Sequence, residues 1–164
     1  MKKRQIISVT IFLLMTSTLS NLLYHVVFST NGRLSLIHED VEQKLHAYIG
    51  GIVRAYGGVA LEIGGTDNHV HLLLKLKPSL PLAHILRFVK AGSSKWMNES
   101  QTIKDRFGWQ RGYGAFTVSE SQADRVRNYI RSQKFHHMKQ SFEDELAILL
   151  IKHHVSYDPK YVLD

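Results

Sequence analysis

Hydrophobic positions along the chain switch between strand-like and helix-like spacing. Residues 21–30 are rich in β-branched and aromatic side chains and end at the turn signal Asn31-Gly32. Apolar residues occupy both the odd-numbered and the even-numbered positions of this run. This run predicts a central strand that is covered on both faces. From Glu39 to about Tyr56 the apolar positions recur with helical spacing, so we predict a helix there.

Two more strands and a second helix follow. Residues 59–64 and 69–76 are apolar runs joined by a Gly-Thr-Asp-Asn turn at 65–68, and this arrangement predicts a hairpin. Pro81 suits the first turn of the next helix. Beyond that helix we expect a looser polar stretch from Gly92 to Gly108.

The last third of the chain predicts one more strand and two helices. The strand occupies the second half of residues 109–118. Ser119-x-x-Gln122 is a capping-box signature, and the helix that it opens is expected to reach about Lys139. A further helix is expected from Ser141 to about His153.

The order β-α-β-β-α-β-α-α predicts an α+β fold, a ferredoxin-like antiparallel β-sheet with packed α-helices. We expect one domain over residues 15–164, because no repeat, low-complexity segment or linker interrupts it. Residues 1–14 are expected to be a non-native upstream extension or a disordered N-terminus, because Met15 opens a sequence typical of a cytoplasmic start. The apolar run from Ile6 to Met15 is too short to span a bilayer, so we expect a cytoplasmic protein without a membrane partner.

The net charge of the chain indicates the kind of partner that it binds. The chain of 164 residues carries 21 Lys and Arg against 14 Asp and Glu, a formal charge of +7. A basic excess on a small domain favours a polyanionic partner, most often nucleic acid, and the alternative is a solvated basic surface without a partner. The absence of cysteine excludes disulfides and a thiolate zinc site.

Two histidines on the second strand of the hairpin are candidate metal ligands. Side chains on a strand alternate faces, so His69 and His71 point the same way. Two imidazoles side by side on a rigid strand can bind a metal ion, although a histidine on a half-buried surface is often only structural.

A polar stripe on the helix after Ser119 offers complementary chemistry. Arg125, Tyr129 and Gln133 are spaced four apart and share one helical face. The tyrosine hydroxyl, with a pKa of about 10, is a poor nucleophile unless a metal polarises the electrophile. The amide oxygen of Gln133 could supply a third ligand beside the imidazoles, a donor set that suits Mg²⁺ or Mn²⁺. These residues together indicate a metal-assisted phosphoryl transferase that captures DNA covalently; packing for the tyrosine and solvation for the glutamine are the simpler alternatives.

These motifs resemble a known family, the single-tyrosine transposases of small bacterial insertion sequences, and within it the insertion-sequence-200-like group. The resemblance covers about residues 17 to 150. It is carried by an opening strand, a His-hydrophobic-His (HUH) motif, an aromatic-glycine segment and the tyrosine helix: Leu23-Tyr24-His25-Val26-Val27-Phe28-Ser29-Thr30, Asp67-Asn68-His69-Val70-His71-Leu72-Leu73, Trp109-Gln110-x-Gly112-Tyr113-Gly114-Ala115-Phe116-x-Val118-Ser119 and Tyr129-Ile130-x-x-Gln133-x-x-His136-His137.

The resemblance implies a mechanism. Tyr129 would attack a phosphodiester of single-stranded DNA, forming a 5′-phosphotyrosine link and leaving a 3′-hydroxyl. His69 and His71 would ligate a divalent ion, Mg²⁺ or Mn²⁺, with Gln133 as the third ligand. The family recognises hairpins near the ends of its element, and it usually acts as a homodimer with composite active sites.

Basic and aromatic residues elsewhere are candidates for DNA contacts. Basic side chains would neutralise phosphates and make binding salt-dependent. Trp109 or Tyr113 would stack on a base or pack in the core. The adjacent pairs His136-His137 and His153-His154 diverge by about 100° on a helix, so we expect them at the surface or at a partner contact. The candidate phosphate contacts are Arg33, Arg87, Lys90, Lys95, Arg111, Arg125, Arg127, Arg131 and Lys134.

Three other functions are compatible with the pattern. A non-catalytic nucleic-acid-binding module explains the charge and fold, but not the coincidence of the histidines with the tyrosine. A metal hydrolase using activated water would leave Tyr129 structural. A domesticated, repeat-associated HUH endonuclease shares the chemistry of the transposases, but often carries a longer basic C-terminal extension.

Overall fold

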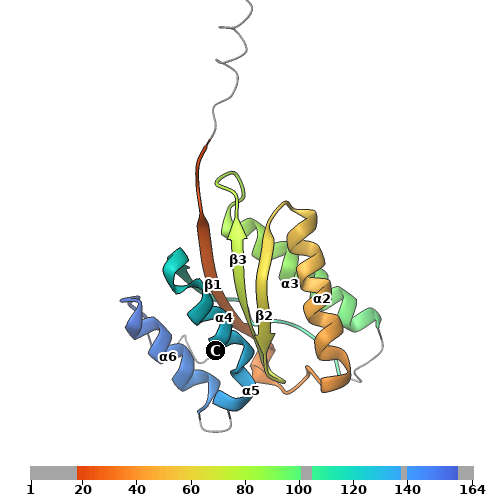
Figure 1. The fold of residues 1–164 in the computed structure, drawn as a ribbon. Helices are drawn as coiled ribbons and strands as arrows, with labels where there is room; N and C mark the ends of the chain where they lie inside the picture. Colours follow the sequence, from red (N-terminus) through yellow and green to blue (C-terminus); the bar gives the residue numbers. More distant parts are fainter. Residues whose placement is uncertain (1–17, 101–104, 138–139, 159–164) are drawn as a thin grey trace, which may run out of the picture.

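The computed structural model describes residues 18–100, 105–137 and 140–158 (Figure 1). The expected extension at residues 1–14 lies outside these ranges. No helix within them is both long enough and apolar enough to cross a membrane.

Four antiparallel strands form the sheet. They are β1 (Leu22–Ser29), β2 (Val59–Gly65), β3 (His69–Leu76) and β4 (Gly114–Val118), in the spatial order β2-β3-β1-β4. The predicted hairpin is the β2–β3 pair, and the predicted central strand is β1, which pairs with both β3 and β4. This strand order with two crossover helices confirms the predicted ferredoxin-like α+β fold.

Helices cover both faces of the sheet, as Figure 1 shows. On one face α2 (Glu39–Ala55) and α3 (Leu82–Glu99) enclose the main core, to which β1 contributes Val26 and Phe28 and β3 contributes Val70 and Leu72. The other face carries α4 (Ala123–Arg131), α5 (Gln133–His136) and α6 (Phe142–Lys152). Short 3-10 turns occupy Asn31–Arg33 and Glu120–Gln122.

A second, smaller core lies under α6. Val27 of β1 and Phe116 of β4 pack there against four residues of α6: Phe142, Leu146, Leu149 and Leu150. The side chain of Ser141 caps α6 by accepting a hydrogen bond from the backbone N–H of Asp144. Packing and capping together fix α6 over the sheet face that carries His69 and His71.

The prediction of a loose polar stretch from Gly92 is wrong in its first part, because α3 continues to Glu99. Ser93 is buried and donates its hydroxyl to the carbonyl of Val89 in the preceding turn. A Cβ on Gly92 would lie 2.9 Å from Cδ1 of Ile52, so glycine here allows α2 and α3 to pack closely. The glycine therefore serves helix packing rather than helix termination.

The helix predicted to run from Ser119 to about Lys139 is also broken. Ser119 makes no side-chain cap, and the helix α4 ends at Arg131. Ser132 leaves helical geometry, with φ −94° and ψ 13°, and its hydroxyl donates to the carbonyl of Asn128. The chain then resumes as α5 at Gln133; Lys139 lies outside the described residues.

Candidate metal centre and tyrosine site

The two histidines of β3 share one face of the sheet. The register pairs His71 with Val27 of β1, and the main core takes the alternate residues Val70 and Leu72. His69 and His71 are fully buried, with ring centroids 5.1 Å apart. Strand alternation therefore places both imidazoles under the helices α4, α5 and α6.

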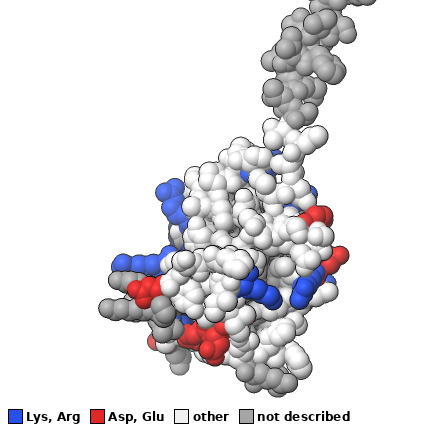
Figure 2. Space-filling view, turned by 90° about the vertical axis from the view of Figure 1, so that its left-hand side faces the viewer, with Lys and Arg blue, Asp and Glu red and all other residues white. Residues whose placement is uncertain are grey.

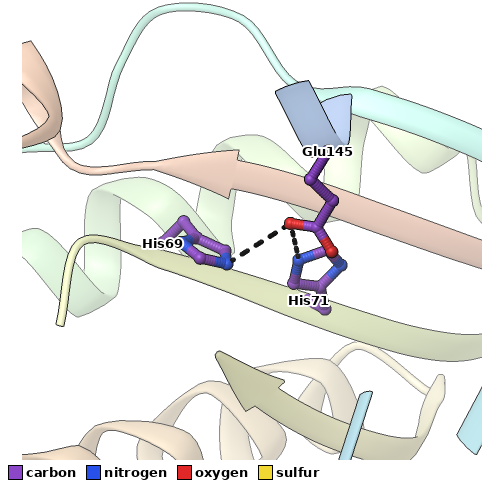
Figure 3. Close-up of side chains that lie close together, drawn as sticks. All are labelled: His69, His71 and Glu145. Carbon is purple, nitrogen blue, oxygen red and sulfur yellow. Dashed lines mark ion pairs between the residues drawn. The ribbon is translucent and has the colours of Figure 1, made fainter. Parts of the chain in front are cut away.

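A carboxylate from α6 completes a cluster with these histidines (Figure 3). Oε2 of Glu145 lies 3.3 Å from Nε2 of His71 and 3.7 Å from Nε2 of His69. The carboxylate is 4% exposed. One ligand atom from each of the three residues lies within 4.8 Å of the others, a spacing that could hold a metal ion.

Glu145 was not identified from the sequence. It stands in the acidic first turn of α6, where Glu143, Asp144 and Glu145 look like charges placed for the helix dipole. The sequence does contain one indication of its burial: Glu145 lies on the apolar side of the helix, with Phe142 and Leu146. A carboxylate at such an apolar position is rarely buried unless it has a partner.

Tyr129 reaches the same carboxylate from α4. Its hydroxyl donates a hydrogen bond to Oε1 of Glu145, and its ring lies 5.9 Å from the ring of His71. The helix sits close to the sheet because an added Cβ at Gly64 of β2 would lie only 2.5 Å from the carbonyl oxygen of Ile130. Glycine at this point admits the helix backbone and brings the tyrosine to the histidine pair.

Gln133 lies in the cluster as well. Its side chain is 1% exposed, although its spacing from Tyr129 also suited a solvated position. Oε1 lies 3.3 Å from Nε2 of His69, and Nε2 donates to Oε1 of Glu145 at 2.8 Å. The amide oxygen and the carboxylate thus lie on the same side of the histidine pair.

His137 was expected at the surface, and this prediction is wrong. Its Nε2 lies 2.8 Å from Oε2 of Glu145, and its ring centroid is 4.4 Å from that of His69. His137 follows Gln133 by four residues and shares its inward face, while His136 stays exposed with its ring 5.2 Å from the ring of Tyr129.

Burial keeps the imidazoles of His69 and His25 neutral. It lowers the pKa of His69 to about 3, with the neighbouring His71 and His137 acting in the same direction. It also lowers the pKa of His25, which lies beside His71 on β1, to about 3. A neutral imidazole has one nitrogen lone pair, which is what a metal ion requires.

The tyrosine and the glutamate are held in opposite protonation states. Burial, reinforced by the hydrogen bond to Glu145, raises the pKa of Tyr129 above its ordinary value, so the phenol is protonated at neutral pH. Burial alone would raise the pKa of Glu145, but the hydrogen bond from His137 and the neighbouring imidazole of His71 outweigh it and hold this pKa below the usual carboxyl range. The cluster therefore combines the neutral imidazole of His69, an ionised carboxylate and a protonated phenol.

These residues fit a divalent cation. Nε2 of His71 is buried and has no hydrogen-bond partner within the described ranges, although Glu145 lies beside it. A nitrogen lone pair facing a carboxylate is unfavourable by itself, and a cation between them would satisfy both groups. Imidazole nitrogens with carboxylate and amide oxygens suit Mg²⁺ or Mn²⁺.

A cavity of about 570 Å³ adjoins the tyrosine between β4, α4 and α6. Tyr129, Glu145 and His25 line its inner end. Arg125 and Lys152, both exposed, bring positive charge to its wall. The cavity thus places positively charged side chains near Tyr129.

Most of the other basic residues singled out from the sequence are engaged in ion pairs. Figure 2 accordingly shows basic and acidic side chains interspersed on the side of the molecule that it presents, rather than one continuous basic surface. The pairs are Arg33–Glu143 at 3.0 Å, Lys95–Glu99 at 3.7 Å, Arg127–Asp124 at 2.7 Å, Arg131–Glu62 at 2.8 Å and Lys134–Glu42 at 2.6 Å.

The remaining basic candidates gather at a second hollow, of about 300 Å³. Arg87, Lys90 and Arg111 line it together with Tyr113, which is 39% exposed. Lys90 donates to the backbone carbonyls of Arg111 and Gly112 and so fixes the loop. Trp109, the other aromatic candidate, is instead a core residue.

Trp109 packs between Phe28 and Phe107, with ring centroids 4.8 Å from each. Its indole N–H donates to the hydroxyl of Ser93 at 2.8 Å. Of the two aromatic residues, only Tyr113 therefore presents a ring to an outside ligand.

Residues 18–133 match the family model described as "Transposase IS200 like". The transposase for insertion sequence element IS200 of Salmonella typhimurium is 24% identical over 118 residues, which cover 69% of this chain and 77% of that protein. The ISDra2 transposase TnpA of Deinococcus radiodurans is 24% identical over 115 residues, 67% of this chain and 82% of the relative.

Two solved structures share the fold. A protein of Deinococcus radiodurans R1 assigned as a transposase superposes with a TM-score of 0.58 at 22% identity, covering 81% of this chain and 98% of that one. A REP-associated tyrosine transposase bound to a REP hairpin gives a TM-score of 0.56 at 14% identity, covering 75% and 72%. The family match and the curated relatives support DNA transposase function, and the chain belongs to the IS200-like transposase family.

Proposed function

We propose that this transposase cleaves and rejoins single-stranded DNA through a covalent link between Tyr129 and the 5′-phosphate of the cut strand, and thereby mobilises a small insertion sequence. One observation carries the proposal. The Tyr129 hydroxyl is hydrogen-bonded to Glu145, the carboxylate that also faces His69 and His71. Nucleophile and metal-binding groups thus share one carboxylate.

His69, His71 and Glu145 would hold a Mg²⁺ or Mn²⁺ ion, with the amide oxygen of Gln133 as a further donor. When bound, such an ion polarises a phosphodiester and stabilises the charge that develops on it. His137, whose Nε2 lies 2.8 Å from the same Oε2 of Glu145 that faces His69 and His71, would orient the carboxylate.

Tyr129 supplies the nucleophile. Its phenolic oxygen forms a bond to phosphorus while the bond from phosphorus to the 3′-oxygen breaks. The phenolic proton passes to Oε1 of Glu145, and the departing 3′-oxygen takes up a proton from water to become the 3′-hydroxyl. Rejoining reverses these steps, when a 3′-hydroxyl attacks the phosphotyrosine. No nucleotide cofactor is required, because the tyrosine ester conserves the bond.

The substrate strand would enter through the cavity beside Tyr129, where Arg125 and Lys152 can neutralise phosphates. The hollow at Arg87, Lys90 and Arg111 offers a second phosphate contact. One solved relative is bound to a REP hairpin, and we propose single strands with hairpin ends as the substrate here too. Access to such DNA implies a cytoplasmic location.

The placement of α4 favours attack in cis, because Tyr129 contacts the cluster of its own chain. A homodimer with composite sites, in which the tyrosine helix serves the partner's histidines, is the alternative assembly that we propose to test. Mixing Tyr129→Phe with His69→Ala protein distinguishes them: restored cleavage requires attack in trans.

The proposal is tested with labelled single-stranded oligonucleotides from the ends of the element, incubated with Mg²⁺ or Mn²⁺. On denaturing gels we expect a labelled band retarded by one protein mass, absent with EDTA and absent in Tyr129→Phe. Cleavage that persists in Tyr129→Phe would indicate activated water as the nucleophile. Binding without cleavage under either ion would indicate a non-catalytic nucleic-acid-binding module.

A further inference from the structure

A further imidazole, that of His25, lies beside the histidine pair. His25 of β1 places its Nε2 2.9 Å from Nδ1 of His71, and the two rings stack with centroids 5.2 Å apart. Both side chains are buried, at 3% and 0% exposure. The sheet register fixes this contact, because His71 pairs with Val27 and His25 lies two residues away on the same face.

Elementary imidazole chemistry assigns a direction to this hydrogen bond when an ion is bound. A neutral imidazole carries one N–H and one lone pair. If Nε2 of His71 gives its lone pair to an ion, the proton must be on Nδ1, and the hydrogen-bond partner of Nδ1 is Nε2 of His25. His25 must then be the acceptor, with its own proton on Nδ1.

We propose that His25 is a positioning residue, which accepts the Nδ1–H of His71 and so holds the ring of His71 with Nε2 directed at the ion. This inference rests on the ion site of the proposed function. It adds a residue of β1 to a site whose other members come from β3 and the helices α4 to α6.

His69 also has a hydrogen-bond partner at Nδ1, but the partners are residues of the hairpin turn. Nδ1 of His69 lies 2.7 Å from Oδ1 of Asn68 and 2.9 Å from Oγ1 of Thr66, in the hairpin turn. Each candidate ligand thus has its Nδ1 in a hydrogen bond and its Nε2 toward Glu145. Such outer contacts fix the tautomer and the orientation of ligating histidines.

The surroundings of His25 explain why an imidazole suits this position. Its ring contacts the rings of Phe116 and Tyr129, with centroids 6.1 and 6.0 Å away. A carboxylate would also accept the hydrogen bond, but a charge buried against aromatic rings is costly. Neutral imidazole provides the acceptor without the charge.

A purely structural role makes a different prediction. If His25 only packs against the two aromatic rings, phenylalanine should replace it without consequence for the ion. If it positions His71, phenylalanine should fail, whereas glutamine, whose Oε1 reaches about as far as the imidazole Nε2, should succeed.

The test is Mn²⁺ affinity of the full chain, measured by calorimetry on wild type, His25→Phe and His25→Gln, with thermal unfolding in EDTA as the check on folding. We expect His25→Phe to weaken Mn²⁺ binding by about 10- to 100-fold and His25→Gln to recover most of it. Asn68→Ala is the matched variant at the other ligand, and a weakening in the same range is expected there. Unchanged affinity in His25→Phe, or equal losses in His25→Phe and His25→Gln, would overturn the proposal.

Nitrogen NMR of Mg²⁺-loaded wild type tests the proposal without any variant, should His25→Phe not fold. We expect the proton on Nδ1 of His71 and a coupling across the hydrogen bond to Nε2 of His25. A proton on Nε2 of His71 would contradict the proposal. If the proposed ion site itself is wrong, wild type will not bind Mn²⁺, or His69→Ala will bind it as tightly as wild type. If only the role of His25 is wrong, His69→Ala will still weaken Mn²⁺ binding.

Discussion

Replacing Gly64 by alanine should separate the tyrosine from the ion site. The new Cβ would lie 2.5 Å from the carbonyl oxygen of Ile130, whereas ordinary contacts begin near 3.4 Å. The α4 backbone must therefore withdraw by the difference, about 0.9 Å, because the opposing atom is main chain and cannot rotate away. Tyr129, one residue before Ile130, moves with it.

A displacement of about 1 Å in a reacting group can cost about 100-fold in rate, so we expect Gly64→Ala to cleave DNA about 100 times more slowly. The two imidazoles lie on β3 and are not displaced directly, so Mn²⁺ affinity should change far less than the rate. Overpacking should also lower the free energy of unfolding by about 1–3 kcal/mol.

Single-turnover cleavage of a labelled oligonucleotide measures the rate, and calorimetry measures the ion affinity. Gly51→Ala is the matched control, since a Cβ at that position of α2 meets no heavy atom within 4 Å. A Gly64→Ala protein that cleaves as fast as wild type would refute the claim that this close contact sets the position of the tyrosine.

Two further predictions concern charge. Glu145→Gln keeps the size of the side chain but removes the buried carboxylate, so Mn²⁺ affinity measured by calorimetry should fall at least about 10-fold; unchanged affinity would leave Gln133 as the sole oxygen donor. Burial lowers the pKa of Lys90 to about 8, so this side chain loses its proton as the pH rises through 8. If it contacts phosphate, affinity for single-stranded DNA in fluorescence anisotropy should fall between pH 7 and pH 9. Lys90→Arg, which stays charged, should abolish that fall, and an equal fall in both proteins would exclude Lys90 as the cause.

Local periodicity was enough to predict the part of the site that lies on one strand. The alternation of β3 puts His69 and His71 on one face, and spacing of four residues relates Tyr129 to Gln133. The strand order likewise follows from the succession of elements, because hairpins and crossover helices leave few topologies open.

The residues that were missed depend on contacts between distant segments. Glu145 is an acidic residue in an acidic first turn, and only the packing of α6 over the sheet shows that it faces the histidines. His137 is different, because it lies four residues after Gln133 and eight after Tyr129, so the same helical spacing already favoured the inward face. In α3, Gly92 suggested a helix end, but it accommodates Ile52 of the neighbouring helix.

The proposed reaction depends above all on a covalent bond between Tyr129 and DNA. Its most direct test is peptide mapping by mass spectrometry after incubation of the wild-type protein with a single-stranded element end and Mn²⁺. We predict one modified peptide, which carries a nucleotide 5′-phosphate on Tyr129 and is absent when EDTA is present. DNA attached to another residue, or strand cleavage with no attached nucleotide, would contradict it.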